Sequence, residues 1–242
     1  MEYTIESLTK DIAKLCMRRS FYASILMPLQ KKVANCGTAC TDGKSLIVDP
    51  NWFGTLNQLQ RETVLMHEAL HLILLHNIRR QNRNAVDWNI ACDYAINSLL
   101  ADDVHEFPDC GCIEPHLLQK YNGQSAEFIF ADLIKESEDN EEQDDDQTEE
   151  SENDDQQNSD DTGGSDGNEE SDSDGSKDGS PQNSESGQLP QPSKPLMGDV
   201  HDLPDMAEDS ESEIKAKEKI LQAKAIAKAM GNMPANIERA IE

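Results

Sequence analysis

The sequence predicts an α+β fold in which two buried helices pack beside a small β-hairpin or sheet. A first helix over about residues 55–75 is apolar nearly all round, and Thr55 is its candidate N-cap. A second helix over about residues 86–100, with Asp87 as candidate N-cap, carries a polar stripe on an otherwise apolar surface. Between residues 33 and 48 an Asp-Gly turn separates two β-rich segments, which is typical of a hairpin.

The other predicted elements are helices. Apolar residues recur at helical spacing over residues 5–27, and Pro28 ends that helix. Residues 125–134 form a further helix that closes the domain. A last helix over residues 211–230 stops at Gly231, and its isoleucines and leucine need a partner surface, on this chain or on another protein.

The formal net charge of −27 is concentrated in one stretch of the chain. Residues 136–185 hold 22 of the 48 acidic residues and a single lysine. A segment with this charge and so few apolar residues cannot bury enough surface to offset its ordering entropy. We therefore expect a domain at residues 1–135, a disordered acidic linker at 136–198 and a helical segment at 199–242. The linker acts as a spacer or as a DNA-mimicking acidic tail.

The sequence favours neither a membrane protein nor a fold held together by disulfide bonds. The chain has no apolar run of about 18 residues with few charges, and its first 20 residues do not form a secretory leader. The six cysteines are expected to be reduced thiols. Cys36, Cys40, Cys110 and Cys112 could make a structural zinc site if the chain turned near residue 37, although neither pair has the usual Cys-x-x-Cys spacing.

The segment His67-Glu68-Ala69-Leu70-His71 has the pattern His-Glu-x-x-His inside the apolar helix. Residues four apart share a helix face, so both imidazoles can hold one Zn²⁺. Glu68, beside the metal, can take a proton from a water that the metal has acidified, for attack on a carbonyl. Two satisfied core histidines with an unrelated glutamate are the alternative, but their desolvation cost is offset by a metal and not by packing.

A catalytic zinc needs a third protein ligand and an open fourth position. Asp93 is the first candidate. Asn89, Asp93 and Asn97 recur every four residues as a polar stripe, and residues 88–100 contain no Lys, Arg or Glu of the kind that a solvated face carries. The stripe therefore needs a partner inside the protein, and a metal centre provides one.

His76 is the alternative third ligand. On a continuous helix it lies about 180° from His67 and about 140° from His71, so its side chain faces away from the metal. Residues 72–75 contain no helix breaker that would turn it back. The sequence therefore favours Asp93 and makes His76 a helix-end or core histidine.

Asp93-x-x-x-Asn97 resembles the Glu-x-x-x-Asp arrangement of thermolysin-type zincins, in which the first acid binds zinc and the second orients a zinc-bound histidine. The resemblance implies that Asp93 is a ligand and that Asn97 orients His67 or His71 by a hydrogen bond. This chain differs from that arrangement in having an amide where those proteins have an acid. An amide polarises an imidazole less than a carboxylate does.

The chain also resembles a metallopeptidase domain of bacteria and phages whose longer members continue, after an acidic linker, into a von Willebrand A-like domain. The resemblance covers most of residues 1–135, and it implies a zincin-like fold, proteolytic activity and a bacterial host cell or phage-infected cell, where we expect a cytoplasmic protein. Its matching elements are Thr41-Asp42-Gly43-Lys44, Val48-Asp49-Pro50, His67 to His76 with Arg79-Arg80, Trp88 to Leu100, and Gly123-Gln124-Ser125-Ala126-Glu127.

The sequence thus predicts a zinc-dependent endopeptidase with one Zn²⁺ per chain, held by His67, His71 and Asp93, and with Glu68 as general base. Its partner is a protein or peptide substrate, and neither a membrane nor direct nucleic-acid binding is expected. One rival is a catalytically inactive metal-binding scaffold with an acidic partner-binding tail. The other is an acidic decoy that competes with DNA for basic proteins. The irregular segment 101–122 adds His105, His116 and Tyr121 as candidates for stabilising an oxyanion.

Overall fold

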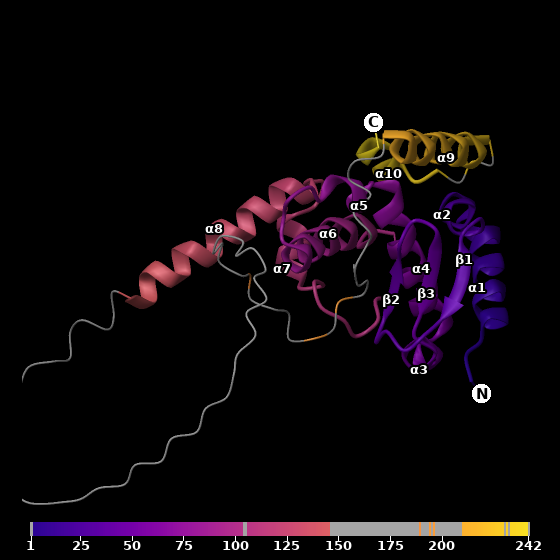
Figure 1. The fold of residues 1–242 in the computed structure, drawn as a ribbon, viewed down its shortest axis with the longest axis horizontal. Helices are drawn as coiled ribbons and strands as arrows, with labels where there is room; N and C mark the ends of the chain where they lie inside the picture. Colours follow the sequence, from indigo (N-terminus) through magenta and orange to yellow (C-terminus); the bar gives the residue numbers. More distant parts are fainter. Residues whose placement is uncertain are drawn as a thin grey trace, which may run out of the picture.

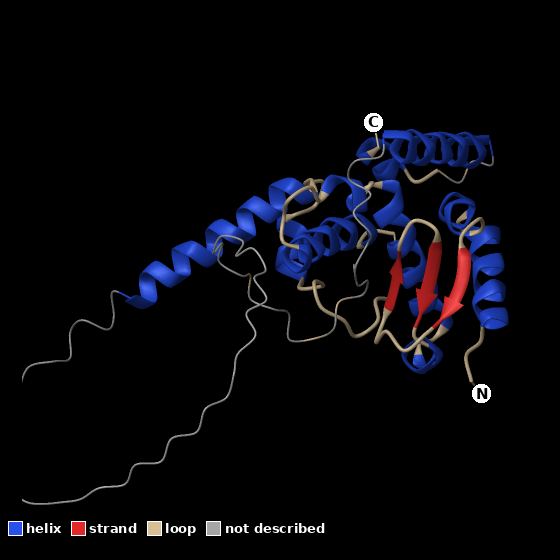
Figure 2. Ribbon diagram, viewed as in Figure 1, coloured by secondary structure: helices blue, strands red, loops and turns tan. Residues whose placement is uncertain are grey.

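The chain folds as an α+β protein made mostly of helices around a small three-stranded sheet (Figures 1 and 2). This confirms the predicted fold class. The structure is a computed structural model, and it describes residues 2–103, 106–145, 189, 194, 196, 210–229, 231 and 233–241. In chain order its elements are α1 (Ile5–Arg18), α2 (Ser20–Leu26), β1 (Gln30–Val33), β2 (Ala39–Thr41), β3 (Ser45–Val48), α3 (Pro50–Thr55), α4 (Gln58–Ile73), α5 (His76–Arg79), α6 (Ala85–Leu100), α7 (Pro115–Lys120), α8 (Ala126–Asp145), α9 (Ser210–Ala229) and α10 (Ala235–Ala240).

The predicted hairpin exists, but its first strand is shorter than expected. β2 pairs antiparallel with β3 across the Asp42-Gly43 turn, and β1 pairs parallel with the other side of β3, which gives the order β1-β3-β2. A single strand over residues 33–40 is therefore wrong. The chain leaves the sheet after β1 and turns at Gly37, whose φ of 81° suits glycine.

Asp49 ties this loop to the next helix. Its carboxylate accepts hydrogen bonds from the backbone N–H groups of Asn51 and Trp52, and so caps α3. The same carboxylate accepts a bond of 2.9 Å from the N–H of Gly37. Burial raises the pKa of Asp49, but these N–H donors outweigh it and leave the pKa below its usual value.

The single helix predicted over residues 5–27 is two helices. Arg19 leaves the helical conformation, with φ of −137°, and separates α1 from α2. No Gly or Pro marks this break in the sequence. The guanidinium group of Arg19 instead donates to the backbone oxygen of Asp103, at 2.9 Å, and lies near its carboxylate. Tertiary contacts therefore override helix propensity here.

The two helices predicted to carry the site are α4 and α6, and both have different caps from those expected. Asn57 caps α4 in a reciprocal capping box with Gln60, whereas Thr55 ends α3. Asn84 caps α6, and the predicted cap Asp87 instead accepts a hydrogen bond from the backbone of Leu189. Both helices are buried along most of their length, and they pack against each other in the core.

The C-terminal helices return to the N-terminal part of the chain. Ala223 and Ala227 of α9 are buried in the same apolar core as α1, α2 and α4, and α9 packs on α2. In α10, Ile237 is also buried there, and the side chain of Asn236 donates to the backbone oxygen of Leu99 at 2.7 Å. The segment therefore docks on the chain itself (Figure 1), although of the isoleucines and the leucine predicted to need a partner surface only Ile220 packs against this core.

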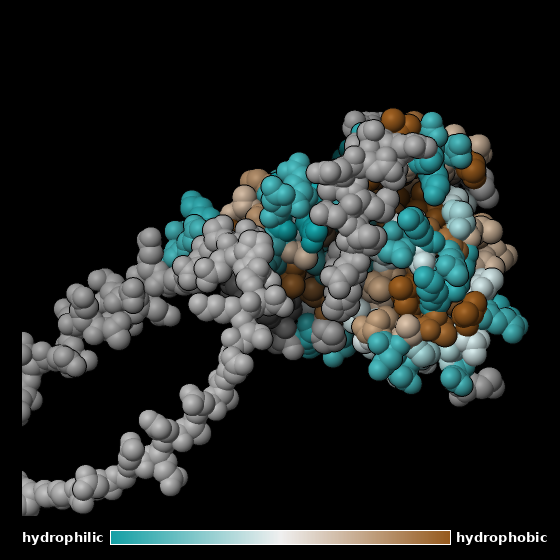
Figure 3. Space-filling model, in the orientation of Figure 1, coloured by the Kyte–Doolittle hydropathy of each residue, from teal (hydrophilic) through white to brown (hydrophobic). Residues whose placement is uncertain are grey.

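Part of α9 stays uncovered. Ile214, Leu221 and Ile226 are exposed to 57%, 65% and 50%. Figure 3 shows apolar atoms at the surface where α9 lies. Among the described helices, none combines the length and the apolar composition that crossing a bilayer requires.

The boundaries predicted for the acidic linker fall mainly on residues outside the described part. Within that part, α8 continues to Asp145, ten residues beyond the expected end of the first domain at residue 135. At the other end, Leu189 is buried against the cluster around Trp88. The division into domain, linker and C-terminal segment stays a prediction.

Docking of α9 can be tested with two alanines of the same helix. Ala227 is fully buried and Ala225 is exposed. Ala227→Glu places a charge in the core and should lower the free energy of unfolding by about 2–4 kcal/mol, whereas Ala225→Glu should change it by less than about 0.5 kcal/mol. Urea denaturation of both variants measures this, and equal effects would show that α9 is not docked.

Candidate metal centre

Three side chains from α4 and α6 converge on one point in the core. His67 and His71 lie one helical turn apart on α4, and Asp93 lies on the facing surface of α6. The two Nε2 atoms are 3.0 Å apart, and each lies 3.3 Å from Oδ1 of Asp93. Within the described ranges, these residues are the one cluster of three or more potential ligands close enough to hold a metal ion.

The size of this triangle fits a tetrahedral metal ion. An ion about 2.0–2.1 Å from each ligand atom requires those atoms to lie about 3.3–3.4 Å from one another. The measured edges of 3.0, 3.3 and 3.3 Å are close to that value. All three side chains are buried, and a carboxylate at 0% exposure needs positive charge beside it. The group could therefore hold a metal ion, with one tetrahedral position left for another ligand.

The same contacts set the protonation of the metal-free site. Burial lowers the pKa of His67, but the neighbouring Asp93 carboxylate outweighs burial and leaves the pKa raised. For His71 burial prevails, and the pKa is lowered. Two Nε2 atoms at hydrogen-bonding distance need one proton between them. A metal ion would replace that proton, so metal uptake should release it.

Asn97 orients His67. The Nδ2 group of Asn97 donates to the backbone oxygen of Cys112 at 3.0 Å, which turns its Oδ1 toward Nδ1 of His67 at 2.9 Å. That nitrogen must then donate, so the lone pair of the neutral ring is on Nε2, inside the triangle, where a metal ion could bind it. The contact predicted for Asn97 is present, and the backbone of Cys112, held at φ of 56°, was not foreseen.

Glu68 lies beside the triangle on the turn of α4 that carries His67. Its side chain is 1% exposed, and its charge contributes to raising the pKa of His67. Its charge also acts on Cys36, although burial is the main reason that the pKa of this thiol is raised. The charge of Glu68 thus acts both on His67 and on a thiol in the loop that precedes β2.

His76 lies closer to the site than the sequence predicted. The expectation of a continuous helix through residues 72–75 is wrong, because α4 ends at Ile73 and Leu75 adopts a left-handed conformation with φ of 56°. Such a conformation costs a bulky residue about 1–3 kcal/mol and has no signal in the sequence. It turns the chain so that Nδ1 of His76 lies 3.4 Å from Nδ1 of His71.

Two hydrogen bonds hold this turn. Nε1 of Trp88, on α6, donates to the backbone oxygen of His76 at 2.9 Å. The guanidinium group of Arg79 donates to the backbone oxygen of Leu74 at 2.8 Å, and it also pairs with the carboxylate of Glu127. The end of α4 is therefore fixed from both α6 and α8.

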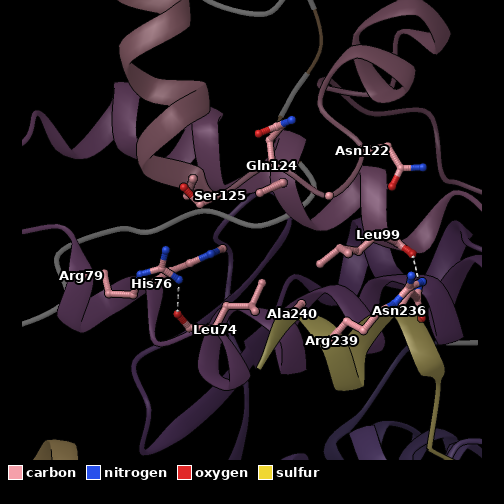
Figure 4. A pocket seen from close by; sticks show the side chains of 13 residues that line it. Leu74, His76, Arg79, Leu99, Asn122, Gln124, Ser125, Asn236, Arg239 and Ala240 are labelled. Atoms are coloured by element: carbon pink, nitrogen blue, oxygen red, sulfur yellow. Dashed lines mark hydrogen bonds between the residues drawn. The ribbon is translucent and has the colours of Figure 1, made fainter. Parts of the chain in front are cut away.

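A cavity of about 480 Å³ lies next to the metal centre, between α5, α6, the start of α8 and α10. Figure 4 shows Arg79 reaching Leu74 on one side of it and Asn236 reaching Leu99 on the other. Among the described residues its lining includes His76 and omits the three candidate ligands. The cavity thus adjoins the site through His76.

The other residues singled out in the sequence lie apart from the triangle or outside the described part. Tyr121 is buried, and its hydroxyl donates to Asp132 at 3.0 Å. His116 is exposed on α7, and His105 lies outside the described residues. The predicted cysteine zinc site does not assemble, because no cluster of three or more such ligands forms around those cysteines within the described ranges.

Asn97 and its neighbour Ser98 provide a stability test of the hydrogen bonds around His67. Asn97→Leu leaves Nδ1 of His67 and the backbone oxygen of Cys112 without partners, and should lower the free energy of unfolding of the metal-free protein by about 1–3 kcal/mol. Within the described structure the buried hydroxyl of Ser98 has no hydrogen-bond partner, so Ser98→Ala removes an unsatisfied group and should not lower the free energy of unfolding. Equal losses in urea denaturation would contradict the assigned network.

The comparisons with known proteins identify the family. No curated protein and no solved structure was found to match this chain. One protein family matches residues 4–242, and its description is "putative metallopeptidase domain". The match includes α4, α6 and the C-terminal helices. Since it covers nearly the whole chain, the protein belongs to this metallopeptidase-domain family.

Proposed function

We propose that the protein is a zinc-dependent endopeptidase of zincin-like architecture. His67, His71 and Asp93 hold one zinc ion per chain, and Glu68 is the general base. The observation that carries this proposal is the triangle of two Nε2 atoms and one carboxylate oxygen with edges of 3.0, 3.3 and 3.3 Å. Three protein ligands and an open fourth position are typical of catalytic zinc.

The ligand types alone do not select the metal, because two histidines and one carboxylate also bind ferrous iron in other proteins. Glu68 favours zinc hydrolysis, since a carboxylate next to the ligand set has a use as a base. A purely structural zinc is closed by a fourth protein ligand and needs no base. Metal analysis of the purified protein decides between the two ions.

In the proposed reaction Glu68 takes a proton from the attacking water and returns it to the departing amine. A bound zinc ion supplies Lewis acidity, which polarises the scissile carbonyl and lowers the pKa of water. Asn97 holds the ring of His67 in place throughout, and the backbone of Cys112 holds Asn97.

The substrate is a protein or peptide in extended form. β2 is one of the two edge strands of the sheet and packs against α4, the helix that carries His67. Cys40 of β2 pairs with Ile47 of β3 in an antiparallel ladder. In such a ladder alternate residues of an edge strand direct their backbone N–H and C=O groups away from the partner strand. An extended peptide can pair with that edge, so cleavage would select unfolded segments more than particular sequences.

A second candidate function is a catalytically inactive metal-binding adaptor. Two observations favour it. The ligands and Glu68 are 0–6% exposed, so a peptide reaches them only after the covering segments move. The apolar side chains Ile214 and Leu221 of α9 are exposed and could bind a protein partner. Hydrolysis assays separate the two functions.

Removal of a ligand should abolish metal binding. His67→Ala and Asp93→Ala should each lower zinc affinity by at least about 100-fold, and His67→Ala should also destabilise the fold, because Asp93 then keeps its buried charge without compensation. His116→Ala is the matched control, since this histidine is exposed on α7. Titration against a competing chelator measures the affinities. An Asp93→Ala protein that binds zinc like the control would remove Asp93 from the ligand set.

Replacement of the proposed base should separate binding from catalysis. Glu68→Gln should retain about one zinc per chain and lose hydrolysis of an unfolded protein by at least about 100-fold, because the metal ligands remain and the base is gone. Glu62→Gln, a buried glutamate one and a half turns earlier on α4, should keep the wild-type cleavage rate. The mechanism is wrong if Glu68→Gln cleaves as fast as this control.

A further inference from the structure

We infer that His76 is a positioning residue of the metal centre, which accepts a hydrogen bond from Nδ1 of His71 and so directs Nε2 of His71 at the metal. The inference rests on the proposed metal site. In this role His76 is neither a metal ligand nor a residue that only fills space in the core. His76 would have the same relation to His71 that Asn97 has to His67.

Geometry places the two rings correctly for this contact. Nδ1 of His76 lies 3.4 Å from Nδ1 of His71, and the ring centroids are 5.4 Å apart in an edge-on arrangement. On the other side of His71, Nε2 lies 3.0 Å from Nε2 of His67 and 3.3 Å from Asp93. Each nitrogen of His71 thus has its own partner, one inside the triangle and one outside it.

Proton balance gives the direction of the hydrogen bond. A neutral imidazole has one N–H group and one lone pair. If Nε2 of His71 directs its lone pair into the triangle, Nδ1 carries the proton and must donate it. His76 must then present a bare Nδ1 and carry its own proton on Nε2.

The backbone around His76 supports a role beyond filling space. Leu75 is held at a positive φ that a leucine rarely adopts, directly before His76. Trp88 holds the backbone oxygen of His76, and its ring packs edge-on against the imidazole at 6.1 Å. A continuous helix would avoid the unfavourable conformation and would carry His76 away from His71. The structure instead keeps the turn that brings them together.

The position of His76 also argues against its being a ligand. The cluster that can hold one ion consists of His67, His71 and Asp93. His76 contacts that cluster through Nδ1 of His71, which is the nitrogen on the far side of the ring from the triangle. His76 therefore affects metal affinity indirectly, by holding the ring of His71 in place.

Two substitutions at position 76 separate positioning from packing. The amide oxygen of His76→Asn can occupy nearly the position of Nδ1 and accept the proton of His71. His76→Leu has the same number and branching of side-chain heavy atoms as Asn but no hydrogen-bond acceptor. Both remove the imidazole ring, so the stability of the two metal-free variants, measured in urea, serves as the control for lost packing.

The first readout is zinc affinity of the full chain, measured with zinc alone against a competing chelator. His76→Leu should bind zinc about 10–100-fold more weakly than the wild type, and His76→Asn should stay within about threefold of it. Equal affinities of the two variants would overturn the inference, whether both are weak or both are like the wild type. Loss of zinc in both variants as complete as in Asp93→Ala would make His76 a ligand.

The second readout is the tautomer of His76, from ¹⁵N spectra of the zinc-loaded wild-type protein. Nδ1 of His76 should be unprotonated and Nε2 protonated. A proton on Nδ1 of His76 would rule out acceptance from His71 and overturn the inference. A wild-type protein that binds no zinc would remove the proposed function itself, whereas a zinc-binding protein with an unaffected His76→Leu variant would remove only the role of His76.

Discussion

The contact of the Asp93 carboxylate with two imidazoles is the interaction on which the rest of the centre depends. Asp93 is fully buried on α6, where an unpaired charge would cost several kcal/mol. The two imidazoles that contact it are on α4, so the two helices must face each other in one register for the carboxylate to keep both contacts. Apolar packing brings α4 and α6 together, and the contact of Asp93 with the two imidazoles determines which helical turn of α4 lies against which helical turn of α6. A shift of one residue along either helix would separate the carboxylate from both rings.

Support for the two histidines comes from different parts of the chain. The ring of His67 is held through Asn97 by the loop that contains Cys112, whereas the ring of His71 lies against His76, at the turn between α4 and α5. Trp88 joins the second support to α6. The centre therefore takes its shape from two helices, one loop and one strained turn. Supports from several elements hold the two rings in place, which lowers the reorganisation needed when a metal ion binds.

The sequence predicted the parts of this arrangement that depend on periodicity. The pair His67 and His71 shares a helix face, and Asp93 stands out in a stripe without the long charged side chains of a solvated surface, so both elements were found from spacing and burial. The sequence did not predict the places where helices are interrupted. Leu75 and Arg19 leave the helical conformation for tertiary reasons, with no Gly or Pro to mark the place, and so the contact of His76 was missed. The pairing of β1 with β3 and the docking of α9 are long-range, and short-range patterns carry no signal of either.

The acidic stretch joins two helical segments that both pack on the folded part of the chain: α8 lies in the apolar cluster around Trp88, and α9 and α10 lie in the core that contains α1, α2 and α4. In such a protein, packing holds the two helical segments to the folded part, so the chain between them does not have to be intact. Cleavage between residues 146 and 209 would yield two fragments that still share buried surface, and their association would become a binding equilibrium where it had been intramolecular. The free-energy cost of closing such a loop grows only with the logarithm of its length. Insertions and deletions in this stretch would therefore change the stability of the folded core little, and its length and charge are free to evolve separately from the candidate metal site.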